Sequence, residues 1–146
     1  MNDPIAILKK DHREAAALLK QLADSKPSAT RRKTTETLVA ALPLHMAIEE
    51  KLVYPLIEKR IGKDEEKEAE VEHGLARDGL AKMTELVDVG GFGAAVAMVT
   101  AGIRHHVKEE ETELFPELKG KLDRDELATL GDAVVAMKKT SRKRAA

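Results

Sequence analysis

Two segments of this chain of 146 residues repeat one another at a distance of 61 residues. The first reads HMAIEEKLVYP and begins at His45, and the second reads HVKEEETELFP and begins at His106. The same shift relates His12 to His73. Because both segments fall within predicted helices, the repeat favours two copies of one helical hairpin that pack about a pseudo-twofold axis.

Apolar residues recur at steps of three and four along four long segments, which is the period of an α-helix with one buried face. Asp3 and Pro4 are typical of a helix start, and Pro27, Gly62 and the pair at 90–91 separate the segments. We expect helices over about residues 4–24, 28–61, 64–89 and 92–119, with Pro43 kinking the second. A shorter fifth helix is expected over about residues 123–140.

These segments predict an all-α chain, arranged as an antiparallel up-down four-helix bundle with a short extra C-terminal helix. We expect residues 1–120 to form the bundle and residues 121–140 to form a helix packed on it or extending from it. Residues 141–146 are expected to be a disordered basic tail. An aromatic content of 2% also suits packed helices better than a sheet.

Composition excludes several classes of protein. The absence of cysteine excludes disulfides, thiolate zinc sites, iron–sulfur clusters and thiol catalysis. A formal net charge of −1 argues against a general nucleic-acid binder, and we interpret the basic stretch 138–144 as a solvated tail. The longest uncharged run, residues 89–103, is shorter than the roughly 20 residues of a membrane span. With no secretory signal at the N-terminus, we predict a cytoplasmic protein.

Six polar side chains fall on the apolar stripes of the four predicted helices. A His and a Glu four residues apart lie on one helix face, so these side chains point into the core. One such histidine is usually a satisfied core residue, but two buried carboxylates without partners would be costly and would repel each other. Cations between them remove this cost. The predicted metal ligands are His12, His45, Glu49, His73, His106 and Glu110.

Six ligands are too many for one tetrahedral zinc ion. Two metals with two histidines each, both bridged by the carboxylates, would each have four protein donors and an open position. Imidazole and carboxylate donors with open positions suit iron, and less specifically manganese. We therefore expect two iron ions, bridged by oxide or hydroxide, that bind dioxygen, peroxide or nitric oxide. Zinc, manganese or an empty site also fits the sequence.

The combination of these motifs resembles the hemerythrin-like (HHE) family of cation-binding proteins over about residues 3–118. The resemblance is carried by Asp11-His12, Glu72-His73 and the two repeated segments. It implies an antiparallel four-helix bundle around a non-haem, oxo-bridged di-iron centre. By matching positions, the resemblance implies that His12 and His45 would bind one iron and His73 and His106 the other, with Glu49 and Glu110 as bridges.

One position departs from the family pattern. Oxygen-carrying hemerythrins have a fifth histidine one turn after the third-helix histidine, where this chain has Arg77, which does not coordinate a metal as a cation. Candidate replacements are Glu72, Glu109 and His105, although we expect His105 to lie at the surface. Arg77 could instead pair with a carboxylate beside the site. The departure disfavours reversible oxygen storage.

Two hypotheses for function follow from a metal site. The leading one is a protein of oxidative or nitrosative stress response or sensing, whose enzymatic version decomposes peroxide. The alternative is a non-catalytic metal-dependent signalling or iron-handling module, with the fifth helix contacting a protein partner. A third hypothesis is a helical interaction protein without metal. We assign no catalytic residue, and we interpret Tyr54 and Phe115 as core packing.

Overall fold

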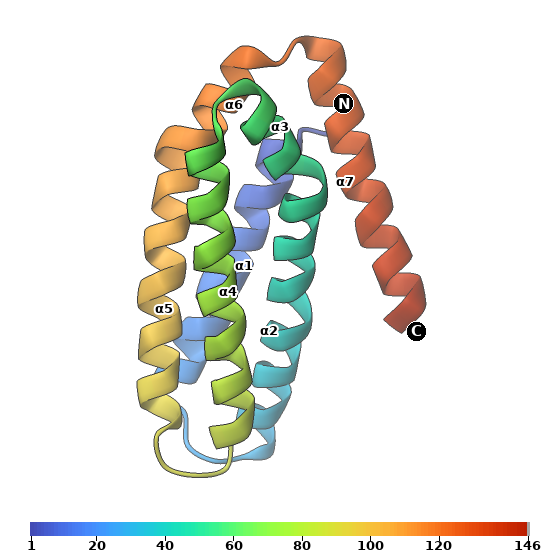
Figure 1. Ribbon diagram of the computed structural model, residues 1–146. Helices are drawn as coiled ribbons and strands as arrows, with labels where there is room; N and C mark the ends of the chain where they lie inside the picture. The colour runs from blue at the N-terminus through green and yellow to red at the C-terminus, as the bar shows by residue number, and fades with distance from the viewer. Residues whose placement is uncertain (146) are drawn as a thin grey trace.

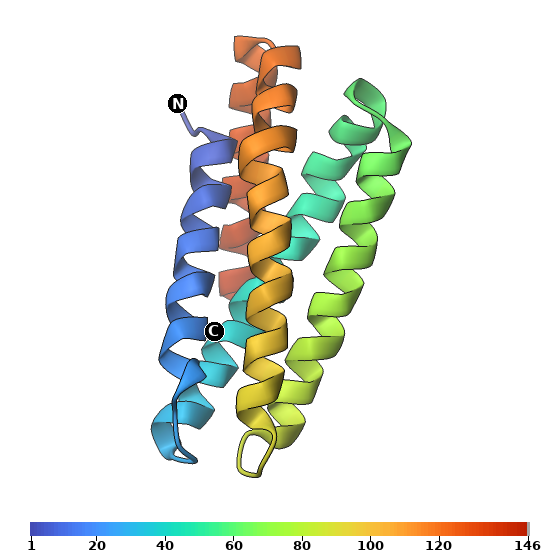
Figure 2. The ribbon, with the colours of Figure 1, turned by 90° about the vertical axis from the view of Figure 1, so that its left-hand side faces the viewer.

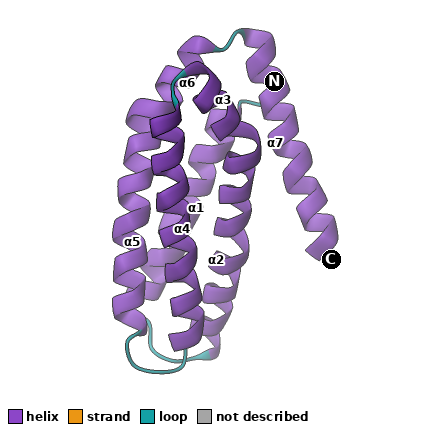
Figure 3. Cartoon of the chain, viewed as in Figure 1, coloured by secondary structure: helices purple, strands orange, loops and turns teal. Residues whose placement is uncertain are grey.

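The computed structural model describes residues 1–145, and all regular structure in that range is helical (Figures 1 and 3). The prediction of an all-α chain is confirmed. The elements are α1 (Pro4–Ala23), α2 (Ala29–Ile48), η1 (Glu49–Val53), α3 (Tyr54–Arg60), α4 (Lys63–Leu86), α5 (Phe92–Glu109), η2 (Glu110–Leu114), α6 (Phe115–Lys121) and α7 (Arg124–Ala145).

Four long helical rods lie side by side, as two perpendicular views show (Figures 1 and 2). The rods are α1, α2 continued by η1 and α3, α4, and α5 continued by η2 and α6. Helix α1 contacts α2 and α5, and α4 contacts α2, α3 and α5. Each rod therefore has two adjacent rods, α3 also contacts α6 of the rod across the interior, and all four rods surround one interior.

The ends of the first two rods form as the sequence predicts. The Asp3 carboxylate accepts hydrogen bonds from the backbone N–H groups of Ile5 and Ala6, and Pro4 occupies the first turn. The Ser28 hydroxyl accepts from the backbone N–H of Arg31 at the start of α2. Helix α2 then continues through Pro43 to Ile48.

Each half of the repeat contains a π-helical segment in the same place. The segments η1 and η2 begin at Glu49 and Glu110, and the same 61-residue shift relates them. The backbone N–H of Tyr54 donates to the carbonyl of Glu49, and that of Phe115 donates to Glu110, so the bonds span five residues. The wider turn of a π-helix changes the direction in which the following side chains point around the helix axis. Residues five apart then lie on the same face.

The apolar core consists of two clusters stacked along the rods. One cluster contains Leu8, Ile48 and Leu118, and the other contains Leu19, Leu42 and Leu80. Along each rod, the inward-facing histidine lies between residues of the two clusters. The polar site is therefore closed off by apolar side chains on both sides.

Helix α7 runs along the outside of the bundle beside α1 and α2 (Figure 1, red). Its residues Leu130 and Val134 are part of the first core cluster. Gly131 lies against the backbone carbonyl of Asn2, and a methyl group there would overlap that oxygen. The Asn2 amide also donates to the Asp132 carboxylate at 3.0 Å.

The expected disordered tail over residues 141–146 needs correction. Helix α7 continues to Ala145, because the segment after Thr140 contains no glycine or proline and consists mainly of good helix formers. Ala146 lies outside the described residues. None of the helices in the described range combines the length and the hydrophobicity that crossing a membrane requires.

Candidate metal centre

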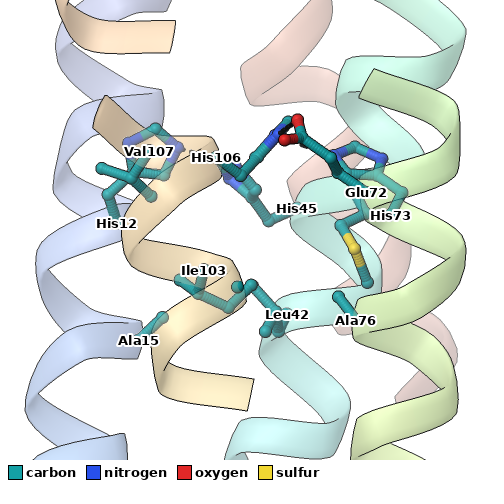
Figure 4. Close-up of a pocket in the computed structure, with 12 residues that line it drawn as sticks. His12, Ala15, Leu42, His45, Glu72, His73, Ala76, Ile103, His106 and Val107 are labelled. Atoms are coloured by element: carbon teal, nitrogen blue, oxygen red, sulfur yellow. Dashed lines mark hydrogen bonds and ion pairs between the residues drawn. The ribbon is translucent and has the colours of Figure 1, made fainter. Parts of the chain in front are cut away.

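The six side chains predicted as metal ligands come together between the two core clusters. The four histidines are supplied by α1, α2, α4 and α5, and the two carboxylates by the first residues of η1 and η2. Figure 4 shows the histidines on facing rods. Glu49 and Glu110 are 0% exposed, and all four histidines are buried. The members are His12, His45, Glu49, His73, His106 and Glu110.

The histidines form two pairs through their Nε2 atoms. The Nε2 atoms of His12 and His45 lie 3.2 Å apart, and those of His73 and His106 lie 3.1 Å apart. Two donors about 2.1 Å from one metal ion lie roughly 3.0–3.4 Å apart when the angle between them is about 90–110°. The spacing within each pair thus matches two donors to one cation.

Both carboxylates lie between the two histidine pairs. Glu110 places Oε1 3.1 Å from His12 Nε2 and Oε2 3.3 Å from His106 Nε2. Glu49 places Oε1 3.2 Å from His45 Nε2 and 3.1 Å from His73 Nε2. Each carboxylate therefore contacts one histidine of each pair.

A second set of carboxylates contacts the outward nitrogens of the histidines. The Nδ1 atoms lie 2.7 Å from Glu111 for His12, 2.9 Å from Asp11 for His45, 2.7 Å from Glu50 for His73 and 2.7 Å from Glu72 for His106. An ionised carboxylate only accepts hydrogen bonds, so each Nδ1 carries the proton. In a neutral imidazole this arrangement leaves the Nε2 lone pair directed into the site, as metal ligation requires.

The charges in the site favour the protonated forms of His45 and His106 when no cation is bound. Burial lowers the pKa of His45, but the charge of Glu49 and the hydrogen bond to Asp11 outweigh it and raise this pKa to about 10. Burial likewise opposes protonation of His106, and the Glu110 and Glu49 carboxylates raise its pKa to about 11. The neighbouring histidines overcome the effect of burial on Glu49 and hold its pKa well below the usual range. A metal cation would take the place of these protons.

Two buried oxygen atoms show that the donor set fits a metal. Glu49 Oε2 and Glu110 Oε1 are buried and accept no hydrogen bond, although Glu110 Oε1 lies 3.1 Å from His12 Nε2. A buried acceptor without a partner costs about 1–3 kcal/mol, and more when it is charged. Imidazole nitrogen and carboxylate oxygen are donors suited to iron, zinc and manganese. The cluster is therefore suited to hold metal cations.

Tyr54 reaches the centre of the cluster, which the sequence interpretation as packing did not predict. Its hydroxyl oxygen lies 2.9 Å from His73 Nε2 and 3.1 Å from His106 Nε2. The same oxygen lies 3.0 Å from Glu110 and 3.3 Å from Glu49. Burial and the two carboxylate charges raise the pKa of Tyr54, so the phenol keeps its proton in the metal-free site.

The residue equivalent to Tyr54 in the second repeat has no hydroxyl. Phe115 stacks on His12, with ring centroids 5.9 Å apart and planes at 8°, so it packs as the sequence suggests. Only the pair formed by His73 and His106 has a phenol beside it. This difference breaks the pseudo-twofold symmetry inside the site.

The residues considered as replacements for a fifth histidine lie outside the cluster. Arg77 donates to both oxygens of Glu50 at 2.8 and 2.9 Å, and Glu50 in turn contacts His73. Glu72 contacts the outward nitrogen of His106, and its other oxygen lies 3.1 Å from His105. His105 is largely exposed and also contacts Glu109.

A small cavity adjoins the histidines on the side of the second core cluster (Figure 4). Its volume is about 20 Å³, and apolar side chains such as Ala15, Leu42, Ile103 and Val107 line it together with the four histidines. A space of this size holds about one water-sized molecule. The surroundings of the site thus restrict a bound ligand to a few atoms.

Paired histidines and shared carboxylates in the interior of a helical protein are a donor set suited to cation binding. Comparison with protein-family models identifies the chain further: residues 3–118 match the Hemerythrin HHE cation binding domain, and the chain belongs to that family. Comparisons with curated proteins and with solved structures gave no match. The matched range includes all six clustered side chains and ends before α7.

Proposed function

We propose that this protein holds two iron ions in an antiparallel up-down four-helix bundle and binds dioxygen, peroxide or nitric oxide. The observation that carries the proposal is the position of Glu49 and Glu110 between the two histidine pairs. One metal would be held by His12 and His45 and the other by His73 and His106, with both carboxylates shared.

Two adjacent iron ions supply electrons and open coordination positions for a small oxidant or radical. The residues of the chain orient the donors and exclude water. The four outer carboxylates fix the imidazole rings through Nδ1, and the apolar clusters above and below limit access of solvent.

We further propose that the Tyr54 oxygen is the additional protein donor beside His73 and His106. Its distances to both Nε2 atoms are those expected between donors to one cation. This assignment replaces the earlier candidates Glu72, Glu109 and His105, whose contacts lie on the outer side of His106 or at the surface.

The small apolar cavity supports a role with diatomic ligands or peroxide in oxidative or nitrosative stress. The enzymatic version of the proposal is peroxide decomposition. The alternative is a metal-dependent signalling or iron-handling module, which is favoured by the contact between α7 and Asp11 at the edge of the site.

The proposal is tested by metal analysis and absorption spectroscopy of the aerobically purified protein. We expect two iron ions per chain and near-ultraviolet bands of oxo-bridged iron without a haem band. The His45→Ala variant should lose metal, whereas the exposed control Met98→Ala should keep it. Absence of bound metal in the parent protein after iron reconstitution would refute the proposal.

Oxygen evolution from peroxide separates the enzyme from the signalling module. The enzymatic version predicts iron-dependent oxygen release that is lost in His45→Ala. If the iron-loaded parent protein releases no more oxygen than that variant, the signalling or iron-handling alternative is favoured.

A further inference from the structure

Helix α7 reaches the candidate metal centre through a single lysine. Lys138 Nζ donates to Asp11 Oδ1 at 2.6 Å, and the other oxygen of Asp11 lies 2.9 Å from His45 Nδ1. The Lys138 and Asp11 side chains are only 20% and 14% exposed. Because solvent screens this pair less than a surface ion pair, the contact fixes both side chains more firmly.

The other half of the repeat has no such lysine contact. The 61-residue shift relates Asp11 to Glu72, which contacts His106 Nδ1 in the same way. The second oxygen of Glu72 lies 3.1 Å from His105, whose side chain is 65% exposed. One outer carboxylate is therefore held by a shielded ammonium group, and its counterpart is held by a solvated imidazole.

The backbone that carries Lys138 is itself held in place. Gly131 allows α7 to approach the backbone of Asn2, and Leu130 and Val134 are buried in the first core cluster. Lys138 lies one helical turn beyond Val134. The ammonium group is thus presented to Asp11 from a docked helix.

We propose that Lys138 is a positioning residue for His45 and couples the C-terminal helix to one of the two metal positions. By binding Oδ1, Lys138 fixes the plane of the Asp11 carboxylate, so that Oδ2 holds the His45 ring in the orientation that directs Nε2 into the site. The inference rests on the proposed function. Helix α7 lies beyond the matched range 3–118, so the family match does not include Lys138.

Coupling between two sites is reciprocal. If α7 helps to orient His45, then a metal bound at His45 stabilises the docking of α7. Occupancy of the site would thereby change how readily the C-terminal helix separates from the bundle. This is a physical route by which the metal centre could influence a partner that contacts α7.

The test compares Lys138→Met with the matched control Lys139→Met, in which the neighbouring exposed lysine is changed in the same way. Iron binding is measured by chelator competition on the full chain. Changing partners of metal-bound histidines typically costs 10–100-fold in affinity, and we expect about tenfold for Lys138→Met because it acts through Asp11. Only one of the two metal equivalents should weaken, and Lys138→Arg should restore most of its affinity.

Hydrogen exchange provides a second readout that needs no variant. Iron binding should slow backbone exchange in α7 of the parent protein and of Lys139→Met, but not of Lys138→Met. Equal iron affinity in the two lysine variants, equal weakening of both equivalents, or metal-independent exchange in parental α7 would each overturn the inference. A parent protein that binds no iron would instead overturn the proposed function.

Discussion

Replacing Tyr54 by phenylalanine removes one buried oxygen atom and leaves the shape of the core unchanged. Tyr54 is 1% exposed, and its single proton can be donated to one carboxylate, with Glu110 at the shorter distance of 3.0 Å. A hydrogen bond to a charged group contributes about 1.5–3 kcal/mol. The histidine nitrogens that no longer contact the phenol oxygen still face Glu49 and Glu110. These carboxylates therefore compensate part of the lost hydrogen-bond energy. We expect the metal-free Tyr54→Phe variant to lose about 2 kcal/mol of stability.

The assay is urea denaturation of the metal-free protein at neutral pH. With a denaturant slope of about 2 kcal/mol/M, the predicted loss lowers the midpoint by about 1 M urea. Thr35→Val is the matched control, because the Thr35 hydroxyl is buried without a hydrogen-bond partner. Removing an unpartnered hydroxyl should leave the free energy of unfolding unchanged or raise it.

The metal-loaded protein provides an independent measurement. If the Tyr54 oxygen is a ligand, the ferric protein should show a visible phenolate-to-iron charge-transfer band that Tyr54→Phe lacks. A metal-free variant as stable as the parent would refute the argument from hydrogen bonding. An unchanged visible spectrum would refute the assignment of Tyr54 as a ligand.

Two further predictions concern pH and the docking of α7. The pKa values of His45 and His106 are raised from 6.5 to about 10 and 11, so the stability they contribute to the metal-free protein is complete below pH 6.5. This contribution to stability declines as pH rises and is lost above about pH 10–11. Urea denaturation across this pH range should detect the decline, and a flat or rising stability of the metal-free protein would contradict it. Gly131→Ala should cost about 1–3 kcal/mol of stability or displace α7 from Asn2. Thermal unfolding measures this cost, with Gly120→Ala as the control, because Gly120 faces open space. Equal melting temperatures and unchanged hydrogen-exchange protection of α7 would refute the close approach of Gly131 to Asn2.

The helices and the inward direction of the six polar side chains could be predicted because both follow from one period. Steps of three and four residues define a face of an α-helix, and the 61-residue repeat shows that His45 and His106 occupy equivalent faces. Burial of Glu49 and Glu110 then required compensation, which indicated a cation. Neither the helical period nor the cost of burying a carboxylate depends on how the rods pack.

The role of Tyr54 could not be predicted because it depends on a local change of helix type. In an α-helix, a residue five positions after Glu49 points about 140° away from it around the axis. The π-helical turn of η1 brings Tyr54 back toward the face of Glu49. Pro55 and Pro116 marked these places in the sequence, but a proline alone does not distinguish a kink from a wider turn.

The contacts of α7 and the partners of the outer carboxylates also could not be predicted from the sequence. Lys138 and Asp11 are 127 residues apart, and no period relates them. Arg77 is an intermediate case, since its position beside His73 suggested a carboxylate partner and the structure identifies Glu50. Long-range pairs of this kind depend on the packing of the rods.

The four outer carboxylates connect the rods in a closed circuit. Asp11 of α1 accepts a hydrogen bond from the histidine of α2, and Glu50 of the second rod accepts one from the histidine of α4. Glu72 of α4 accepts from the histidine of α5, and Glu111 of the fourth rod accepts from the histidine of α1. Every rod thus supplies one carboxylate to the next rod and receives one from the rod before it. A rotation of any one rod would strain two of these bonds at once. These four hydrogen bonds form a closed ring around the site. The orientation of each histidine is therefore set by the whole bundle before any cation binds.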